Sequence, residues 1–495
     1  MGSAKAPRPP ADNYRGVLRN YVGGEWIAST AVESQQVINP AIGQALAEVP
    51  LGSAEDVDVA VAAAQEAFWA WRQTPPQQRV QCLYRLKRLM EENHDRLARI
   101  VTEEHGKALD DARGSIQRAI ENVEVACGIP SLMMGYGLED GAARGIDEDV
   151  VRQPLGVFAA ICPFNFPAMV PFWYLPYAVA CGDTFIVKPS EQVPLTQRAI
   201  FELIAESGFP PGVINLVNGA RPVVDAILDH PKIRGVSFVG STPVARYIYR
   251  RASENGKRVQ AQGGAKNVLV LMPDAVLEKT VPNVMGSSFG SAGQRCLAGS
   301  LAVTVGDRDG RAVQAIADAA RALRVGNGLE PGVDVGPVIS EQAQERILAS
   351  IQRAIDDGAR LVVDGRGAAE SRDGFFVGPT LFDRVTPDMS IAKTEIFGPV
   401  LGVIAVDTLD QALKVIDDIP YGNAASIFTQ DGKAAREFRY RAQVGNVGVN
   451  VGVAAPMAYF PFSGWKDSFF GTLHGQGRDA IDFFTDRKVV ITRWF

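Results

Sequence analysis

The chain has 495 residues, more than the ~100–200 residues of a typical domain, so we expect two or three domains. Hydrophobic residues make up 46% and charged residues 21%, a mixture typical of soluble globular proteins. The net charge is −6 and the chain has no basic run, which argues against a nucleic-acid partner.

The longest apolar stretch, residues 167–181, contains Pro171 and Pro176. It is shorter than the ~20 residues that cross a bilayer, so we expect a buried loop and helix and no membrane partner. Residues 1–13 lack the apolar core of a signal peptide, which predicts a disordered arm and a cytoplasmic protein.

The five cysteines form no CxxC pair and no metal-like cluster with the four histidines. This pattern predicts free thiols in a reducing compartment and no metal site. Buried cysteines mostly act as small apolar side chains, so no cysteine is a candidate nucleophile without further signals.

Two helices are expected near the N-terminus. Ser53 and Asp56 form a capping-box pattern, after which apolar residues recur at helical spacing (Val57, Val61, Ala64, Phe68, Trp71). A second helix is predicted from about Gln78 to Glu104, with Gly106 as its stop and three apolar side chains inward (Leu83, Leu86, Met90).

Short apolar runs then alternate with helical segments. Continuous apolar runs favour strands that are buried on both faces of a parallel sheet. One set comprises residues 157–163, 184–189, 213–219, 236–240 and 267–272, and a second set after Cys296 comprises residues 301–305, 399–406, 424–428 and 447–452. The two sets imply two α/β domains with a cleft between them. The tail, residues 487–495, alternates like an edge strand that invites pairing with another subunit.

Two segments could bind a dinucleotide. In residues 236–245 a strand leads through Gly240 into a helix, whose free N–H groups can face a pyrophosphate, although an ordinary tight turn has the same pattern. Lys188 and Glu191 lie at the end of the strand at 184–189, where a doubly wound sheet binds ligands. A carboxylate there can accept both ribose hydroxyls of NAD and would repel the 2′-phosphate of NADP. The alternative is a solvated pair on a loop.

Small residues surround Cys296 in the segment FGSAGQRC, residues 289–296, and the adjacent Arg295 can favour a thiolate. Residues 395–400, EIFGPV, place a carboxylate and an aromatic ring before a Gly-Pro turn. Taken singly, each of these segments is more often structural.

Taken together and in this order, the segments resemble the aldehyde dehydrogenase superfamily. The motifs are PFNFP (163–167), KPSE (188–191), FVGST (238–242), GGAKN (263–267), GQRC (293–296) and EIFGP (395–399), and the resemblance extends from YVGGEW (21–26) to the final strand. It implies an α/β aldehyde dehydrogenase fold with a Rossmann-like NAD-binding domain (1–133 and 152–262), an α/β catalytic domain (263–464) and a β oligomerisation segment (134–151 and 478–495). It also implies a homodimer or a homotetramer.

The resemblance assigns roles residue by residue. Cys296 matches the nucleophile whose thiolate forms a thiohemiacetal with the aldehyde, and Asn165, with the backbone N–H of Cys296, matches the oxyanion hole. Hydride transfer to NAD then leaves an acyl thioester. The matched cofactor-binding residues are Phe164, Lys188, Glu191, Gly240, Ser241, Glu395 and Phe397, of which Glu395 corresponds to the carboxylate that holds the nicotinamide ribose.

One position departs from the pattern of the hydrolytic members. Gln262 stands where they carry the glutamate that activates water. A neutral amide cannot accept a proton, so hydrolysis loses a general base worth ~10²–10⁴-fold in rate. A thiolate needs no such base, which makes coenzyme A the natural acyl acceptor. The alternative is a hydrolytic enzyme altered at this one site, but Gly263 and Ala265 differ from the hydrolytic motif as well.

The match narrows in AKN (265–267), SLMMG (131–135) and residues 448–469 and 472–477, which resemble the CoA-acylating methylmalonate-semialdehyde dehydrogenase branch. In that branch Arg118 and Arg295 would fix a substrate carboxylate and aim its aldehyde at Cys296. A surface salt bridge is the alternative for Arg118.

The implied reaction converts methylmalonate semialdehyde (or malonate semialdehyde), CoA and NAD to propionyl-CoA (or acetyl-CoA), carbon dioxide and NADH. One alternative is a hydrolytic NAD-dependent dehydrogenase of another aldehyde, with an unrecognised base. The other is a non-catalytic binding or structural relative, which the joint presence of Cys296, Asn165 and Glu395 disfavours.

Overall fold

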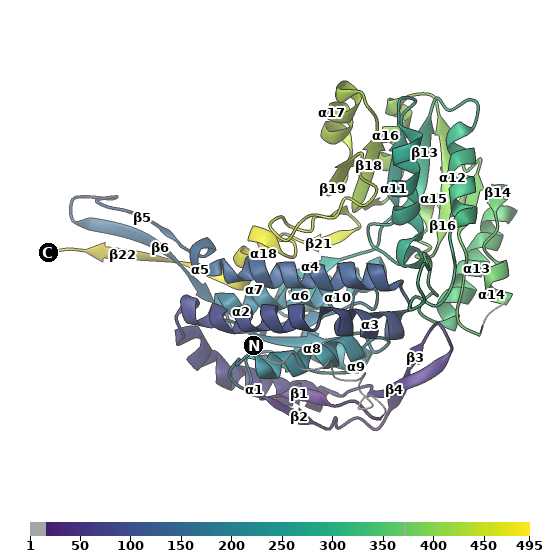
Figure 1. Cartoon of the computed structure of the whole chain (residues 1–495). Coiled ribbons are helices and arrows are strands. Elements are labelled where there is room, and N and C mark those ends of the chain that lie inside the picture. Colours follow the sequence, from purple (N-terminus) through teal and green to yellow (C-terminus); the bar gives the residue numbers. More distant parts are fainter. Residues whose placement is uncertain (1–15, 371–372) are drawn as a thin grey trace, which may run out of the picture.

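The computed structural model describes residues 16–370 and 373–495 and contains two large β-sheets with helices packed around them (Figure 1). The N-terminal arm predicted at residues 1–13 lies outside the described residues. The mixed α/β class is as predicted. The predicted domain boundaries stay a prediction.

The first sheet has the order β2-β1-β9-β8-β7-β10-β11-β21. Its five central strands, in the order β9-β8-β7-β10-β11, are parallel. β1 pairs antiparallel with β9, β2 pairs antiparallel with β1, and β21 pairs antiparallel with β11. The strands are β1 (Asn20–Val22), β2 (Glu25–Ile27), β7 (Val157–Ile161), β8 (Thr184–Lys188), β9 (Ile214–Leu216), β10 (Ile233–Val239), β11 (Arg258–Gln262) and β21 (Phe469–Gly471). The four runs predicted as parallel strands from residue 157 to 240 are confirmed in this sheet.

The second sheet has the order β14-β15-β16-β13-β12-β18-β19 and is parallel except for β14. Its strands are β12 (Asn267–Leu271), β13 (Gly299–Val305), β14 (Arg360–Val363), β15 (Thr380–Asp383), β16 (Val400–Val406), β18 (Ala424–Phe428) and β19 (Asn446–Val449). The assignment of residues 267–272 to the first set of strands is wrong, because β12 pairs with β13 and β18. An apolar run indicates burial on both faces but does not identify the neighbouring strands.

The helices cover both sheets. They are α1 (Ala54–Gln73), α2 (Pro76–Glu92), α3 (His94–His105), α4 (Leu109–Cys127), α5 (Ile129–Leu132), α6 (Met169–Phe172), α7 (Leu175–Cys181), α8 (Leu195–Glu206), α9 (Arg221–Asp229), α10 (Thr242–Glu254), α11 (Leu277–Phe289), the 3₁₀ helix η2 (Gly290–Gly293), α12 (Arg311–Ala322), α13 (Glu341–Asp356), α14 (Gly367–Glu370), α15 (Ser390–Lys393), α16 (Leu409–Asp418), α17 (Gly432–Arg441) and α18 (Gly477–Phe484). The segment 167–181 forms the buried helices α6 and α7, as predicted.

Helix α1 confirms its prediction, since Ser53 and Asp56 form the capping box and all five apolar side chains are buried. The single helix predicted from Gln78 to Glu104 is wrong, because Asn93 separates α2 from α3 with non-helical φ and ψ angles of −107° and 13°. The Asn93 side chain donates to the carbonyl of Leu89 at 2.8 Å. Such local side-chain bonds compete with the helical hydrogen-bond pattern. Gly106 ends α3 in a left-handed conformation, as expected of a stop residue.

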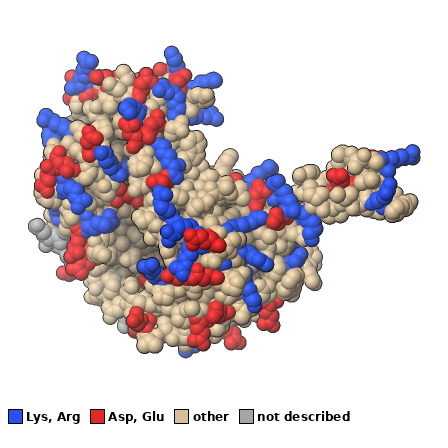
Figure 2. Space-filling view, turned by 180° about the vertical axis from the view of Figure 1, so that it is seen from behind, with Lys and Arg blue, Asp and Glu red and all other residues tan. Residues whose placement is uncertain are grey.

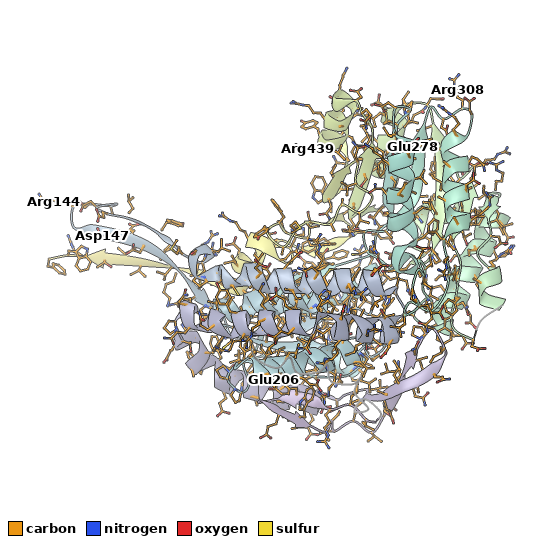
Figure 3. All side chains as sticks on the ribbon, viewed as in Figure 1. Arg144, Asp147, Glu206, Glu278, Arg308 and Arg439 are labelled. Carbon is orange, nitrogen blue, oxygen red and sulfur yellow. The ribbon has the colours of Figure 1, made fainter. Side chains whose placement is uncertain are left out.

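A projecting sheet of three strands extends away from the rest of the molecule (Figure 1). It consists of β5 (Tyr136–Leu138), β6 (Ile146–Pro154) and β22 (Thr485–Arg493), and Arg144 and Asp147 mark its tip in Figure 3. β22 is an edge strand, as predicted, but its residues do not alternate between buried and exposed positions, since nearly all of them are exposed.

Two smaller pairs complete the strands, β3 (Ser34–Asn39) with β4 (Gln44–Pro50) and β17 (Tyr421–Gly422) with β20 (Trp465–Lys466). Acidic and basic side chains are interspersed over the face seen in Figure 2. Across the described residues, every helix is too short or too polar to cross a membrane. In the same part of the chain, no group of three His, Cys, Asp or Glu side chains could hold a metal ion.

Candidate active site

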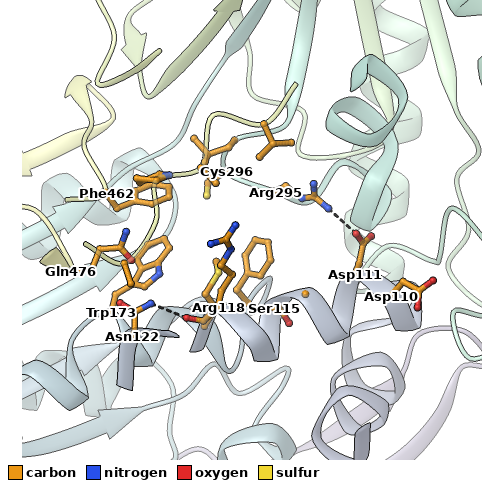
Figure 4. A pocket seen from close by; sticks show the side chains of 18 residues that line it. Asp110, Asp111, Ser115, Arg118, Asn122, Trp173, Arg295, Cys296, Phe462 and Gln476 are labelled. Carbon is orange, nitrogen blue, oxygen red and sulfur yellow. Dashed lines mark hydrogen bonds and ion pairs between the residues drawn. The ribbon is translucent and has the colours of Figure 1, made fainter. Parts of the chain in front are cut away.

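Cys296 lies in the turn that follows η2 and lines two cavities. The larger, of about 330 Å³, is lined by Cys296 together with Arg118 and Arg295, two residues predicted to bind substrate (Figure 4). Its other walls include Trp173, Phe166, Phe462, Ala458, Gln476 and Asp111. The smaller, of about 20 Å³, is lined by Cys296 with Glu395 and Phe397, which were predicted to bind the cofactor. The fold therefore brings residues from distant parts of the chain to both sides of one thiol.

Two asparagines fix the backbone of Cys296. Its carbonyl oxygen accepts hydrogen bonds from Asn267 Nδ2 at 2.8 Å and from Asn423 Nδ2 at 2.9 Å. The sequence motifs gave neither asparagine a role. Asn267 belongs to the AKN motif, but Asn423 has no local signal because it reaches Cys296 only through the pairing of β12 with β18.

The predicted oxyanion donor Asn165 is buried beside the same turn. Its Nδ2 atom donates to the carbonyl of Gln294 at 3.1 Å, and because an amide carries two N–H groups, a second one remains for a ligand. The backbone carbonyl of Asn165 accepts a hydrogen bond from Lys107 Nζ at 2.6 Å. Lys107, a residue that the sequence did not single out, also lies 3.9 Å from the centre of the Phe166 ring. Burial lowers the pKa of Lys107 to about 7.

The surroundings of Cys296 disfavour the charged thiolate form of its side chain. Burial and the nearby Glu395 carboxylate raise the pKa of Cys296 to about 12, and Arg295 opposes this rise. Arg295 therefore lowers the pKa of Cys296, as expected, but burial and Glu395 raise it by more. Burial also raises the pKa of Glu395 to about 7, although a 2.9 Å hydrogen bond from the backbone N–H of Ala265 favours its charged form. The other four cysteines are buried and free, as Cys296 is free.

The two arginines differ in their surroundings. Arg118 on α4 donates to Glu121 on the same helix at 2.8 Å, contacts Met457, and has a 40% exposed side chain. Arg295 donates to Asp111 at 3.0 Å, and its side chain is 17% exposed. Arg118 therefore makes the ion pair considered as its alternative and also lines the Cys296 cavity.

The residues predicted to hold the adenosine and pyrophosphate part of a dinucleotide lie at the carboxyl ends of β8 and β10. Lys188 is the last residue of β8, and its Nζ atom lies 3.2 Å from a carboxylate oxygen of Glu191 in the loop that follows. Gly240 and Ser241 connect β10 to α10, and Ser241, the N-cap, makes no side-chain capping bond. The N–H groups of the first turn of α10 thus suit a pyrophosphate, and the Glu191 carboxylate suits a ribose. This set of groups fits NAD.

The rings of Phe164 and Phe397 meet edge to face, with centroids 5.8 Å apart and planes at 84°. Phe397 also lines the small cavity with Cys296 and Glu395. The structure thereby joins the PFNFP and EIFGP motifs, which are far apart in the sequence, at one side of the thiol.

Gln262 ends β11 and is buried. Its Nε2 atom donates to the carbonyl of Phe462 at 2.8 Å, and the Phe462 ring lines the Cys296 cavity. The next residue, Gly263, donates its N–H to Ser468 at 2.8 Å. The Gln262 side chain is therefore a neutral amide, fixed by a hydrogen bond, that cannot take up a proton at neutral pH.

Comparison with known proteins agrees with this geometry. The model of the aldehyde dehydrogenase family matches residues 26–490. Malonate-semialdehyde dehydrogenase 1 of Geobacillus kaustophilus is 50% identical over 97% of this chain and 98% of its own. The malonate-semialdehyde dehydrogenase of Halalkalibacterium halodurans is 46% identical over 96% of this chain and 98% of its own.

Two solved structures are similar over nearly the whole chain. One is a Sinorhizobium meliloti protein, assigned as a methylmalonate-semialdehyde dehydrogenase and complexed with NAD (TM-score 0.95, 44% identity, 98% of this chain and 99% of that one). The other is a methylmalonate-semialdehyde dehydrogenase from Oceanimonas doudoroffii (TM-score 0.95, 47% identity, 97% and 98%).

Proposed function

The chain belongs to the aldehyde dehydrogenase family, and we propose that it oxidises malonate semialdehyde or methylmalonate semialdehyde with NAD and transfers the acyl group to coenzyme A. The observation that carries this proposal is the neutral, buried Gln262 beside a cavity that contains both Cys296 and two arginines. The names of the relatives support the same substrate class.

Substrate binding would use the charges in the larger cavity. Arg118 and Arg295 both line it, and a pair of guanidinium groups can hold one carboxylate. A semialdehyde held in this way presents its carbonyl carbon to Cys296, which removes the entropic cost of aligning the two groups. Apolar walls, including Trp173 and Phe462, would keep water from the reacting carbon.

Attack of the Cys296 thiolate on the aldehyde gives a thiohemiacetal, with the negative charge on its oxygen. The free N–H of the Asn165 amide and the backbone N–H of Cys296 would stabilise that oxyanion. NAD, when bound, would supply the acceptor for the hydride on the thiohemiacetal carbon. Glu395 and Phe397 would hold the nicotinamide end, and Lys188, Glu191, Gly240 and Ser241 the adenosine and pyrophosphate end, as the groups found there allow.

The resulting thioester on Cys296 has a carboxylate on its α carbon. Loss of carbon dioxide leaves a carbanion that the thioester carbonyl stabilises, and uptake of a proton gives an acetyl or propionyl thioester. Gln262 offers no base to activate water. The thiolate of CoA attacks the thioester carbonyl instead, and the Cys296 thiolate is the leaving group.

The experiment is an assay of NADH formation from each semialdehyde, with and without CoA, in which the products are identified. We expect acetyl-CoA or propionyl-CoA together with carbon dioxide. Free acid formed at the same rate without CoA would refute the acyl transfer, and no NADH from either semialdehyde would refute the substrate class.

We also propose that the chain assembles as a homodimer or a homotetramer through the projecting sheet. Within the described residues one edge of β22 pairs with no strand, and apolar side chains on the sheet and directly after it are exposed (Tyr136, Leu138, Val489, Ile491, Trp494). Such an edge favours pairing with another chain. Native mass spectrometry should show the oligomer, and Val489→Asp with Ile491→Asp should dissociate it. Val32→Asp is the control, because Val32 is exposed elsewhere.

The five free cysteines support a cytoplasmic location.

A further inference from the structure

The turn that precedes Cys296 has a strained backbone. Ser291, Ala292 and Gly293 have positive φ angles of 52°, 53° and 70°. Left-handed backbone is unfavourable for residues that carry a Cβ atom, so contacts elsewhere must hold Ser291 and Ala292. Gly293 packs so closely that a Cβ atom there would lie 2.2 Å from the carbonyl oxygen of Gly398.

Asp111, in the first turn of α4, holds this strained turn. Its Oδ2 atom accepts from the backbone N–H of Ser291 at 2.8 Å and from the Ser291 hydroxyl at 3.2 Å. Its Oδ1 atom accepts from Arg295 Nη2 at 3.0 Å (Figure 4). One carboxylate therefore joins the backbone of the turn to the guanidinium of the residue before Cys296.

The same turn carries groups that act on the reacting atoms. Gln294 follows it, and its carbonyl accepts from Asn165 Nδ2 at 3.1 Å, so the position of the turn also sets the position of the oxyanion donor. The Nε atom of Arg295 is buried and has no hydrogen-bond partner in the described part of the chain. A buried donor without a partner gains an acceptor when a carboxylate binds beside it.

We propose that Asp111 is a positioning residue, which holds residues 291–293 in their left-handed conformation and orients Arg295 toward the carboxylate of the substrate. The second half of this assignment rests on the proposed function. Asp111 itself leaves the Nε donor of Arg295 free, because it binds the Nη2 atom.

The neighbouring Asp110 provides a matched control. It lines the same cavity, but its side chain is 93% exposed and pairs with Arg113 on the same helix. Asp110→Asn and Asp111→Asn remove the same charge from adjacent positions. Only Asp111→Asn replaces one of the two carboxylate oxygens that accept from Ser291 and Arg295 by an N–H donor.

The kinetic test compares the semialdehyde with propionaldehyde, which has no carboxylate. We expect Asp111→Asn to raise KM for the semialdehyde about tenfold more than KM for propionaldehyde, as the loss of one charge-assisted hydrogen bond would do. Asp110→Asn should leave the ratio unchanged. Equal effects of Asp111→Asn on the two substrates, or no effect on either, would overturn the orienting role.

A thermal test examines the turn without any substrate. Asp111→Asn should lower the Tm more than Asp110→Asn does. Adding Ser291→Gly should recover part of the loss, because glycine adopts positive φ freely, but it should not restore KM for the semialdehyde. If Asp111→Asn alone does not fold, the double variant carries the kinetic test.

A double variant that is no more stable than Asp111→Asn would overturn the role of Asp111 in holding the turn. A wild-type enzyme that is inactive on the semialdehydes would instead refute the proposed function, and the thermal comparison would still decide the role of Asp111 at the turn.

Discussion

Two elements reach the Cys296 cavity with opposite chemistry. Helix α4 brings charge, since it carries Arg118 and, through Asp111, holds Arg295. The end of β11 brings the neutral amide of Gln262, whose hydrogen bond to the Phe462 carbonyl links it to the cavity wall. Charge is present where a charged substrate would bind and absent where a base would activate water. Substrate choice and the fate of the acyl group are therefore set by separate elements, and they can be changed separately.

The largest effect is expected when a charge is placed on the neutral side. Gln262→Glu places a carboxylate where the resemblance puts the glutamate of hydrolytic members, and a positioned general base contributes ~10²–10⁴-fold to a rate. We expect the variant to release free acid from the semialdehyde without CoA. The readout is product identification by mass spectrometry, with Gln262→Asn as the control that changes shape but adds no base. A variant that still depends fully on CoA would contradict this role of position 262.

A somewhat smaller loss should follow from Asn165→Ala. Removal of one oxyanion-hole donor costs ~10²–10³-fold in kcat. Because the donor acts on charge that develops during the reaction, we expect kcat to fall while KM for the semialdehyde changes little. Steady-state kinetics test this, with the Tm as the control for folding. A change confined to KM would place Asn165 in ground-state binding instead.

Removal of charge from α4 should affect binding selectively. We expect Arg118→Ala to raise KM for the semialdehyde by about 10- to 100-fold, in line with the loss of a charge-assisted hydrogen bond, and to change KM for propionaldehyde far less. Arg113→Ala is the matched control, because Arg113 lies on the same helix and pairs with Asp95 and Asp110. Similar effects on both aldehydes would make Arg118 a structural residue.

The smallest effect concerns the thiol itself. The charge of Glu395 contributes to the raised pKa of Cys296, which is about 12. Glu395→Gln removes that charge, so the pKa of the thiol should fall and more thiolate should be present at a given pH. We expect alkylation by iodoacetamide at pH 9 to become a few-fold faster, since the rate follows the thiolate fraction. The variant Cys296→Ala gives the background from the four buried cysteines. Slower alkylation would contradict the conclusion that Glu395 raises the pKa of Cys296.

Much of this site could be predicted because its motifs are local. Cys296, Gln262 and the strand ends near Lys188 and Gly240 are recognisable from short segments, and the structure brings Cys296 and both arginines to one cavity. Lys107, Asp111 and Asn423 could not be found in this way. Each acts on a residue more than 50 positions away, through a contact that depends on how helices and strands pack.

The errors in the predicted fold have the same origin. The break at Asn93 depends on a side-chain bond that competes with the helix, while the apolar periodicity continues through it. The place of β12 in the second sheet depends on its neighbours β13 and β18, which an apolar run does not identify. Local sequence patterns indicate which residues are buried, but tertiary contacts determine where a helix breaks and which sheet a strand joins.

The central claim is that water does not hydrolyse the thioester on Cys296 and that CoA cleaves it. Intact-mass spectrometry of the enzyme mixed with NAD and either semialdehyde, without CoA, measures that thioester directly. We expect an acetyl or propionyl adduct that peptide mapping assigns to Cys296, that persists in water and that is lost within seconds once CoA is added. An adduct that decays as fast without CoA as with it, or no adduct while NADH is formed, would contradict the claim.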